Sequence, residues 1–138
     1  MDLSLRTQYA IRALVCLALR PGAGVVTARQ MADFGGIPAK YVEQVMHDLR
    51  RAGIVQGQRG KGGGYTLARE PESPTVLQVV EALEGPVEQF GRLRGSDPVQ
   101  PLLEPLWVNV RDSLRVTLGS TTIADVAAHA ASAAFYSI

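Results

Sequence analysis

The segment from Thr27 to Leu67 constrains the fold most, because its turn residues divide it into short elements in a fixed order. Thr27 is a favourable N-cap for a helix over residues 28–34, since its hydroxyl can accept a hydrogen bond from an otherwise unpaired backbone N–H. Gly35 and Gly36 end that helix, because glycine enters the left-handed region without steric penalty. Pro38 suits the first position of a second helix, where its missing N–H is not needed.

The second helix is amphipathic and leads into a hairpin. Its apolar residues recur at helical spacing, so one face can be buried: Tyr41, Val42, Val45, Met46 and Leu49. Gly53 closes this helix, and residues 54–55 and 65–67 are predicted as short strands around a glycine-rich loop. Two helices joined by a glycine turn and followed by a hairpin predict a winged helix-turn-helix, so the fold class is mainly α with a small β-hairpin wing.

The start of the second helix carries the candidate base-reading residues. In a helix-turn-helix these first residues meet base edges in the major groove of DNA. Lys40 can reach a phosphate or guanine, Gln44 can pair with adenine, and Glu43 can accept a hydrogen bond from cytosine N4. Ala39 and Tyr41 flank Lys40 on the first turn of this helix. The sequence therefore predicts a protein that binds double-stranded DNA.

Other candidate DNA contacts surround this helix. An arginine at the hairpin tip suits a narrow, electronegative minor groove, and a cation one turn along the second helix can reach the DNA backbone. The residues concerned are Thr27 and Arg29 in the first helix, Arg50 in the second, and Arg59, Gly60 and Lys61 in the wing.

An earlier helix is predicted over residues 4–19, with Ser4 as its N-cap. Arg6, Thr7 and Tyr9 near its start can touch phosphate oxygens. For Tyr9, a partly buried place in the core with its hydroxyl in water is an equal alternative.

The charge distribution agrees with DNA binding. Residues 1–70 have a balance of +5 and residues 71–138 a balance of −4, although the whole chain carries only +1. A basic front half beside an acidic back half is typical of a DNA-reading domain joined to a domain with another role, and a chance distribution of solvated charges is the alternative. We therefore predict a DNA-binding domain over residues 1–70 and a second region over residues 71–138.

The second region begins with a proline-containing linker and a helix that Thr75 caps and Gly85-Pro86 ends. Residues 87–101 show no period and are predicted as loop; a longer helix follows over residues 102–118, with Pro105 near its start. Its apolar residues have coiled-coil spacing and predict a homodimer interface, although packing on its own domain is the alternative. The predicted interface residues are Leu103, Trp107, Val110, Leu114 and Leu118. Thr122 caps a last short helix over residues 123–131.

The chain resembles a bacterial family of iron–sulfur cluster regulators and cysteine-metabolism repressors, the Rrf-two type (IscR/NsrR/CymR-like). The resemblance covers nearly the whole chain and implies a dimeric winged-helix transcription regulator; it also favours a phosphate contact for Tyr9. The motifs that carry it are Tyr9-Ala10 with Arg12-Ala13-Leu14, residues 40–44 (KYVEQ), residues 49–55 (LRRAGIV), Arg59-Gly60, residues 62–65 (GGGY) and residues 83–86 (LEGP).

The cluster ligands of that family are missing from this chain. Members of that family that carry a cluster hold it with three cysteines in the loop after residues 84–86, and here this loop contains neither cysteine nor histidine. Thiolates are the usual ligands of iron–sulfur clusters, so we expect no cluster and no other cofactor. The two histidines, His47 and His129, are far apart in the sequence with no cysteine nearby, so we expect no other metal site.

One cysteine remains, Cys16 in the first helix. A buried structural role is expected for it. A redox-sensing role, assisted by Arg12 and Arg20, is the hypothesis that thiol-sensing relatives suggest.

Enzymatic activity is not expected. In a phosphate-binding P-loop, lysine precedes Ser or Thr and a helix, whereas Lys61 precedes glycines and a strand. A winged helix that contacts a protein, such as a metabolic enzyme, is the alternative to a DNA-binding repressor. No signal peptide or membrane-spanning run is apparent, which predicts a cytoplasmic protein. The effector is left open between a small molecule held between the helix after the linker and the predicted dimer helix, a thiol oxidant and a protein partner.

Overall fold

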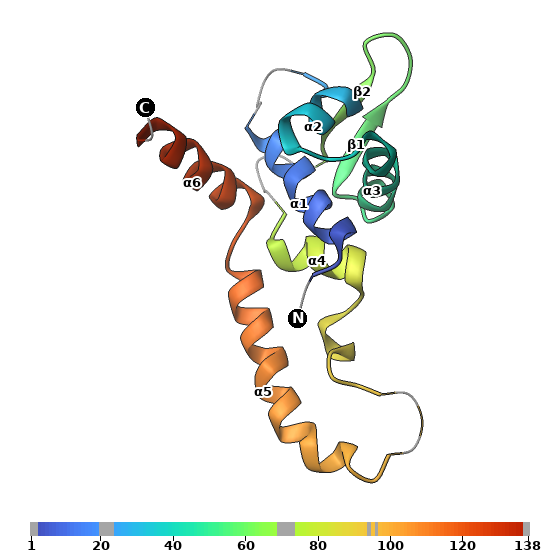
Figure 1. Cartoon of the computed structure of the whole chain (residues 1–138), viewed down its shortest axis with the longest axis vertical. Coiled ribbons are helices and arrows are strands. Elements are labelled where there is room, and N and C mark those ends of the chain that lie inside the picture. Colours follow the sequence, from blue (N-terminus) through green and yellow to red (C-terminus); the bar gives the residue numbers. More distant parts are fainter. Residues whose placement is uncertain (1–2, 20–23, 69–73, 94, 96, 137–138) are drawn as a thin grey trace.

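The structure, a computed structural model, describes residues 3–19, 24–68, 74–93, 95 and 97–136, with side chains as far as His129. The chain is mainly helical with one hairpin, as predicted (Figure 1). The elements in order are α1 Leu5–Ala18, α2 Ala28–Gly35, α3 Ala39–Arg51, β1 Val55–Gln58, β2 Gly64–Leu67, α4 Val76–Glu84, the 3-10 turn η1 Val87–Gln89, α5 Gln100–Gly119 and α6 Ile123–Tyr136.

One hydrophobic core holds α1, α2 and α3 together. Leu14 from α1, Met31 from α2, and Met46 and Leu49 from α3 are fully buried in it. Each of these residues lies on the apolar face of its amphipathic helix. Burying such a side chain stabilises the fold by roughly 1.5–3 kcal/mol. This packing fixes the orientation of α3 relative to α1 and α2.

The N-cap of α2 and the glycine turn between α2 and α3 form as predicted, with two differences in the helix ends. Thr27 caps α2 in a reciprocal capping box with Gln30, and Gly36 adopts the left-handed conformation at φ 62°. Helix α2 extends one residue further than predicted, through Gly35. Pro38 is the N-cap of α3 and not its first helical residue, because Tyr41 N–H donates to its carbonyl.

The wing is an antiparallel pair with Val55 opposite Leu67 and Gln58 opposite Gly64. The first strand therefore runs three residues beyond the predicted 54–55, because the pairing of Gln56 and Gln58 depends on the partner strand. An isolated bridge joins Val26, just before α2, to Tyr65. This bridge ties the wing to the helix-turn-helix.

The second half of the chain returns to the first. Val79 of α4 and Ile123 of α6 are fully buried in the same core as α1. Thr122 caps α6 as predicted, by accepting from Asp125 N–H at 3.0 Å. Helix α6 continues to Tyr136, past the predicted residue 131. The domain boundary after residue 70 lies within residues 69–73, outside the described residues, and stays a prediction.

Helix α5 extends away from the winged domain (Figure 1). It begins at Gln100, two residues before the predicted start, and includes Pro105 within its length. The predicted loop before it contains the 3-10 turn η1. Helix α1 ends at Ala18, one residue before the predicted end at residue 19. Among the described residues, no helix combines the length and apolar character needed to cross a membrane.

Candidate nucleic-acid interface

Helix α3 separates a buried face from a polar face. Val42, Val45, Met46 and Leu49 are buried, as predicted, while Tyr41 is only partly buried. The polar residues recur every three or four positions and so share one side of the helix. This exposed row consists of Lys40, Glu43, Gln44, His47, Arg50 and Arg51. Ala39 is exposed at the start of the same helix.

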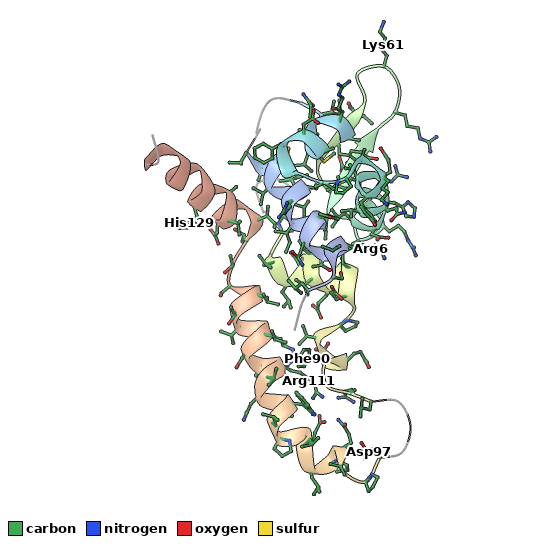
Figure 2. All side chains as sticks on the ribbon, viewed as in Figure 1. Arg6, Lys61, Phe90, Asp97, Arg111 and His129 are labelled. Carbon is green, nitrogen blue, oxygen red and sulfur yellow. The ribbon has the colours of Figure 1, made fainter. Side chains whose placement is uncertain are left out.

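The wing adds further charge at the same end of the molecule. Arg59 and Lys61 are exposed at its tip, and Lys61 points away from the body of the protein (Figure 2). Gly60 and Gly62 in this tip have positive φ values of 96° and 80°, which side chains adopt only with strain. The predicted contacts Thr27 and Arg29 lie at the start of α2, with Arg29 exposed.

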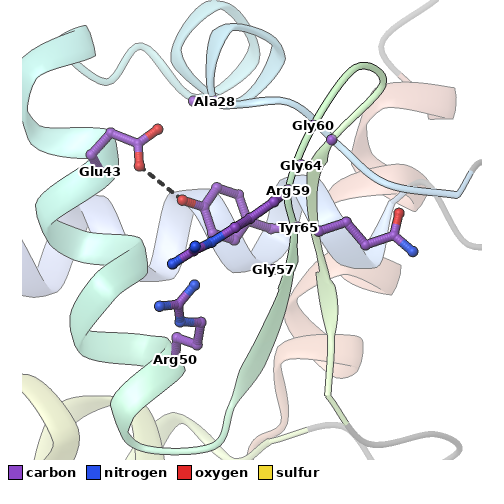
Figure 3. A pocket seen from close by; sticks show the side chains of 10 residues that line it. Ala28, Glu43, Arg50, Gly57, Arg59, Gly60, Gly64 and Tyr65 are labelled. Atoms are coloured by element: carbon purple, nitrogen blue, oxygen red, sulfur yellow. Dashed lines mark hydrogen bonds between the residues drawn. The ribbon is translucent and has the colours of Figure 1, made fainter.

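A polar hollow of about 460 Å³ lies between α3 and the wing (Figure 3). Glu43, Arg50, Arg59 and Tyr65 line it together with Ala28 at the start of α2. The hollow therefore brings together candidate residues from two separate elements, Glu43 and Arg50 of α3 and Arg59 of the wing. Its two guanidinium groups against one carboxylate favour a polyanion such as the DNA backbone.

Tyr65 links the wing to α3. Its hydroxyl donates a hydrogen bond of 2.8 Å to Glu43 Oε2 (Figure 3). Partial burial and this bond with Glu43 raise the pKa of the Tyr65 hydroxyl, so it remains protonated and able to donate at neutral pH. Sequence reasoning missed this contact, because Tyr65 was predicted as a strand residue and as part of the family motif at residues 62–65, without a side-chain partner.

Tyr9 and Tyr41 form an aromatic pair beside the exposed row. Their ring centroids are 5.5 Å apart, and Lys40 Nζ lies 5.0 Å from the Tyr41 centroid. Tyr9 is half-buried against the core, as the core alternative expects. A phosphate contact for Tyr9 stays a prediction.

One residue of α1, Thr7, does not have the predicted role, while a phosphate contact for Arg6, whose side chain is 50% exposed, stays a prediction. Thr7 is fully buried, and its hydroxyl donates to Glu84 Oε1 at 2.6 Å, so the predicted phosphate contact of Thr7 is wrong. Arg6 forms an ion pair with Asp48 of α3. Both contacts reach partners distant in sequence, which local patterns cannot reveal.

Cys16 is buried, with 1% of its surface exposed. The guanidinium of Arg12 donates to the carbonyl of Gly35 at 3.1 Å, at the end of α2. Arg20, the second cation invoked for Cys16, lies outside the described residues. Burial favours the structural role of this thiol over the redox role.

The predicted interface residues of α5 have mixed surroundings. Trp107 packs edge-on against Phe90 of its own chain, with ring centroids 5.9 Å apart. Val110, Leu114 and Leu118 are partly buried, and Leu103 is 39% exposed. A hollow of about 410 Å³ between α4, η1 and α5 includes Leu114 and Leu118 in its wall. For Trp107 the structure thus shows the alternative, packing on its own chain.

The loop after α4 does not fit an iron–sulfur cluster. Arg111, 4% exposed, donates to the carbonyl of Phe90 at 2.9 Å and to Glu104 at 2.6 Å. A side chain on Gly91 would come within 2.6 Å of the Trp107 ring. The buried Trp107 indole N–H, without a hydrogen-bond partner among the described residues, is a donor and cannot ligate a metal. A guanidinium and an indole, with no thiolate or imidazole, are the wrong groups for iron.

A metal site of another kind would need several histidine, cysteine or carboxylate ligands close together. Within the described ranges, no three His, Cys, Asp or Glu residues come together in a way that could hold a metal ion.

Known proteins resemble this chain over almost its whole length. The family Rrf2, described as iron-dependent transcriptional regulator, matches residues 3–129. The HTH-type transcriptional regulator CymR of Bacillus subtilis is 32% identical over 129 residues, covering 94% of this chain and 91% of CymR. The HTH-type transcriptional regulator IscR of Cereibacter sphaeroides is 37% identical over 135 residues, covering 91% of this chain and 86% of IscR.

Solved structures agree with this relationship. The structure of B. subtilis CymR, the global cysteine regulator, has a TM-score of 0.79 at 31% identity, covering 94% of this chain and 98% of that one. The T. potens IscR structure has a TM-score of 0.75 at 32% identity, with coverages of 94% and 88%. The matched regions include the helix-turn-helix, the wing and α5. The chain therefore belongs to the Rrf2 family of winged-helix, DNA-binding transcriptional regulators.

Proposed function

We propose that this regulator is a cytoplasmic homodimer that represses transcription by binding a palindromic operator. The observation that supports this most is the exposed polar row of α3 beside a wing that carries Arg59 and Lys61. Two copies related by a two-fold axis would place two α3 helices in successive major grooves, with the Arg59 wings in the flanking minor grooves.

Gln44 and Arg59 test this docking separately. Gln44→Ala removes a group suited to pair with adenine, and Arg59→Ala removes the wing cation; each is expected to weaken specific binding by ~1–3 kcal/mol. The measurement is a fluorescence titration of a duplex chosen from a random pool by the wild-type protein. Arg92→Ala, which removes an exposed arginine after η1 and outside α3 and the wing, is the matched control for the loss of one cation and should bind as the wild type does. Full affinity in both Gln44→Ala and Arg59→Ala would refute the docking.

The alternative function, a winged helix that contacts a metabolic enzyme, predicts different behaviour. Neutralising phosphates releases counterions, so DNA affinity should fall steeply with salt concentration. A protein-contact module would bind duplexes weakly and without sequence preference.

The dimer is expected to form through α5. This helix of 20 residues exposes apolar side chains, with Leu102 77% and Val116 71% exposed. A shallow apolar groove of about 340 Å³ runs along it and includes the predicted interface residues Val110, Leu114 and Leu118. A helix of this length spans about 30 Å, so the same helix of a second copy can cover the groove along its length.

Acidic substitution tests the dimer. Leu114→Glu and Val116→Glu should each shift the mass measured by sedimentation from two chains to one, since a carboxylate would be buried without a partner. Phe34→Glu, at an apolar position of α2 that is 51% exposed, is the control for the same chemical change outside α5 and should stay dimeric. A wild-type protein that sediments as one chain would contradict the proposal.

We propose that the protein works without an iron–sulfur cluster, because the loop residues are the wrong donors. Protein purified without oxygen is expected to be colourless and free of iron. A brown protein that contains iron and acid-labile sulfide would overturn this.

The hollow between α4 and α5 is the place where a small-molecule effector would fit. Its lining is apolar apart from Glu84 and Gln89, which favours an apolar compound with one hydrogen-bonding group.

Cys16 is proposed to be structural. Cys16→Ser should keep any response of DNA binding to oxidant, and loss of that response would revive the redox role.

A further inference from the structure

The hydrogen bond from Tyr65 to Glu43 connects the two elements expected to meet DNA. The Tyr65 hydroxyl in β2 of the wing lies 2.8 Å from Glu43 Oε2 in the exposed row of α3 (Figure 3). Apart from this bond, Glu43 belongs to α3 and Tyr65 to the hairpin. The contact gives Glu43 a defined position that an exposed helical glutamate does not normally have.

Tyr65 itself is held firmly by its backbone. Its N–H donates to the carbonyl of Val26 and its carbonyl accepts from Val26 N–H, both at 2.9 Å. A side chain on the neighbouring Gly64 would lie 2.5 Å from the Val26 carbonyl oxygen, so only glycine permits this close approach. Because the backbone of Tyr65 is held by its hydrogen bonds to Val26, the phenol hydroxyl is a donor with a defined position. Such a donor can orient its acceptor, the Glu43 carboxylate.

The phenol lies beside two cations. Gly57 pairs with Tyr65 across the hairpin, and a Cβ added there would make an ordinary van der Waals contact with the Tyr65 ring, at 3.5 Å. Arg50 and Arg59 line the same polar hollow as Tyr65. The ring thus reaches Glu43 next to two guanidinium groups suited to phosphates.

Glu43 retains one carboxylate oxygen for another partner. Tyr65 occupies Oε2, and in the described part of the chain no other donor bonds to this carboxylate. An ionised carboxylate accepts only, and among base edges in the major groove cytosine N4 offers the matching donor. Fixing the side chain before binding lowers the entropy lost when that bond forms.

We propose that Tyr65 is a positioning residue that orients Glu43 to select cytosine at one position of each operator half-site. This inference rests on the proposed docking of α3 in the major groove. It adds a residue outside α3 to the determinants of sequence preference, acting through Glu43 and without touching a base.

Selection from a random duplex pool, followed by sequencing, tests the proposal. The wild-type protein should select a motif with a cytosine that Glu43→Ala no longer prefers. Tyr65→Phe keeps the ring but removes the donor, and it should lower the preference for that cytosine by about 2- to 10-fold, the effect of one hydrogen bond. The rest of the motif and the salt dependence of binding should not change.

The double variant distinguishes positioning from a structural role. If the hydroxyl acts through Glu43, Tyr65→Phe adds nothing in a Glu43→Ala background. Thr66→Val, which removes a hydroxyl at the next position of the same strand, should keep the cytosine preference.

Three other outcomes would contradict this account in different ways. An unchanged preference in Tyr65→Phe would overturn the inference alone. A uniform loss of affinity for all duplexes, with a smaller salt dependence, would show that Tyr65 merely holds the wing in place and would also overturn it. A wild-type protein that selects no motif would instead refute the proposed function on which the inference rests.

Discussion

Replacing Thr7 with valine removes one hydroxyl from the buried junction between α1 and α4 while keeping the shape of the side chain. In the wild type, Glu84 Oε1 accepts from Thr7 Oγ1 at 2.6 Å and from Ser4 N–H at 3.1 Å. These bonds, from Ser4 and from Thr7, lower the pKa of the Glu84 carboxyl below its ordinary value of 4.5. The junction fixes the start of α1 relative to α4.

The magnitude follows from the surroundings. A hydrogen bond to a charged group contributes roughly 1.5–3 kcal/mol, but Glu84 is exposed and water screens it. We therefore expect Thr7→Val to lower the free energy of unfolding by about 1 kcal/mol at pH 7. With a urea m-value of about 2 kcal/mol/M, the midpoint should fall by about 0.5 M at matched protein concentration.

The stability difference between wild type and Thr7→Val should depend on pH, and the direction of that dependence tests the role of Glu84. A carboxyl whose pKa is lower in the folded protein stabilises the fold above pH 4.5, and this contribution is lost as the pH falls through the folded pKa. The difference between wild type and Thr7→Val should therefore shrink as the pH falls from 7 to about 3.5. In a Glu84→Gln background the difference should be small at both pH values. A difference that stays constant with pH would refute the role assigned to Glu84.

Further substitutions test other parts of the account. Gly64→Ala should destabilise the protein by more than 1 kcal/mol, on the order expected for strained packing, and release the wing, since the added carbon meets the Val26 carbonyl at 2.5 Å; hydrogen exchange at Val26 and Tyr65 would report it. Trp107→Ala should lower the unfolding free energy by about 2 kcal/mol, because it leaves a void beside Phe90. Cys16 should resist an alkylating reagent until the protein unfolds, as measured by mass spectrometry.

The winged helix-turn-helix was predictable because its signals are local. Thr27, Gly36 and the apolar period of α3 act within a few residues, and each appears in the structure where predicted. Strand ends were less accurate, since the pairing of β1 depends on β2.

Contacts between residues distant in sequence were not predictable from local patterns. The bond from Thr7 to Glu84 joins residues 77 positions apart, and the bond from Tyr65 to Glu43 joins residues 22 apart. The burial of Arg111 at the loop carbonyl of Phe90 likewise depends on how α5 returns toward η1. Such polar contacts have no periodic signature, so the candidate site was predicted as a set of residues but without its internal geometry.

The central claim is that two copies of this chain read one palindromic duplex with α3 and the wing. The most direct measurement is a titration of the selected duplex, and of a scrambled one, over a range of salt concentrations with the number of bound chains determined. The account predicts two chains per duplex, a preference for the selected sequence of about 10³-fold or more, and a linear fall of log affinity with log salt concentration. Equal, salt-insensitive binding of both duplexes, or a single bound chain, would contradict it.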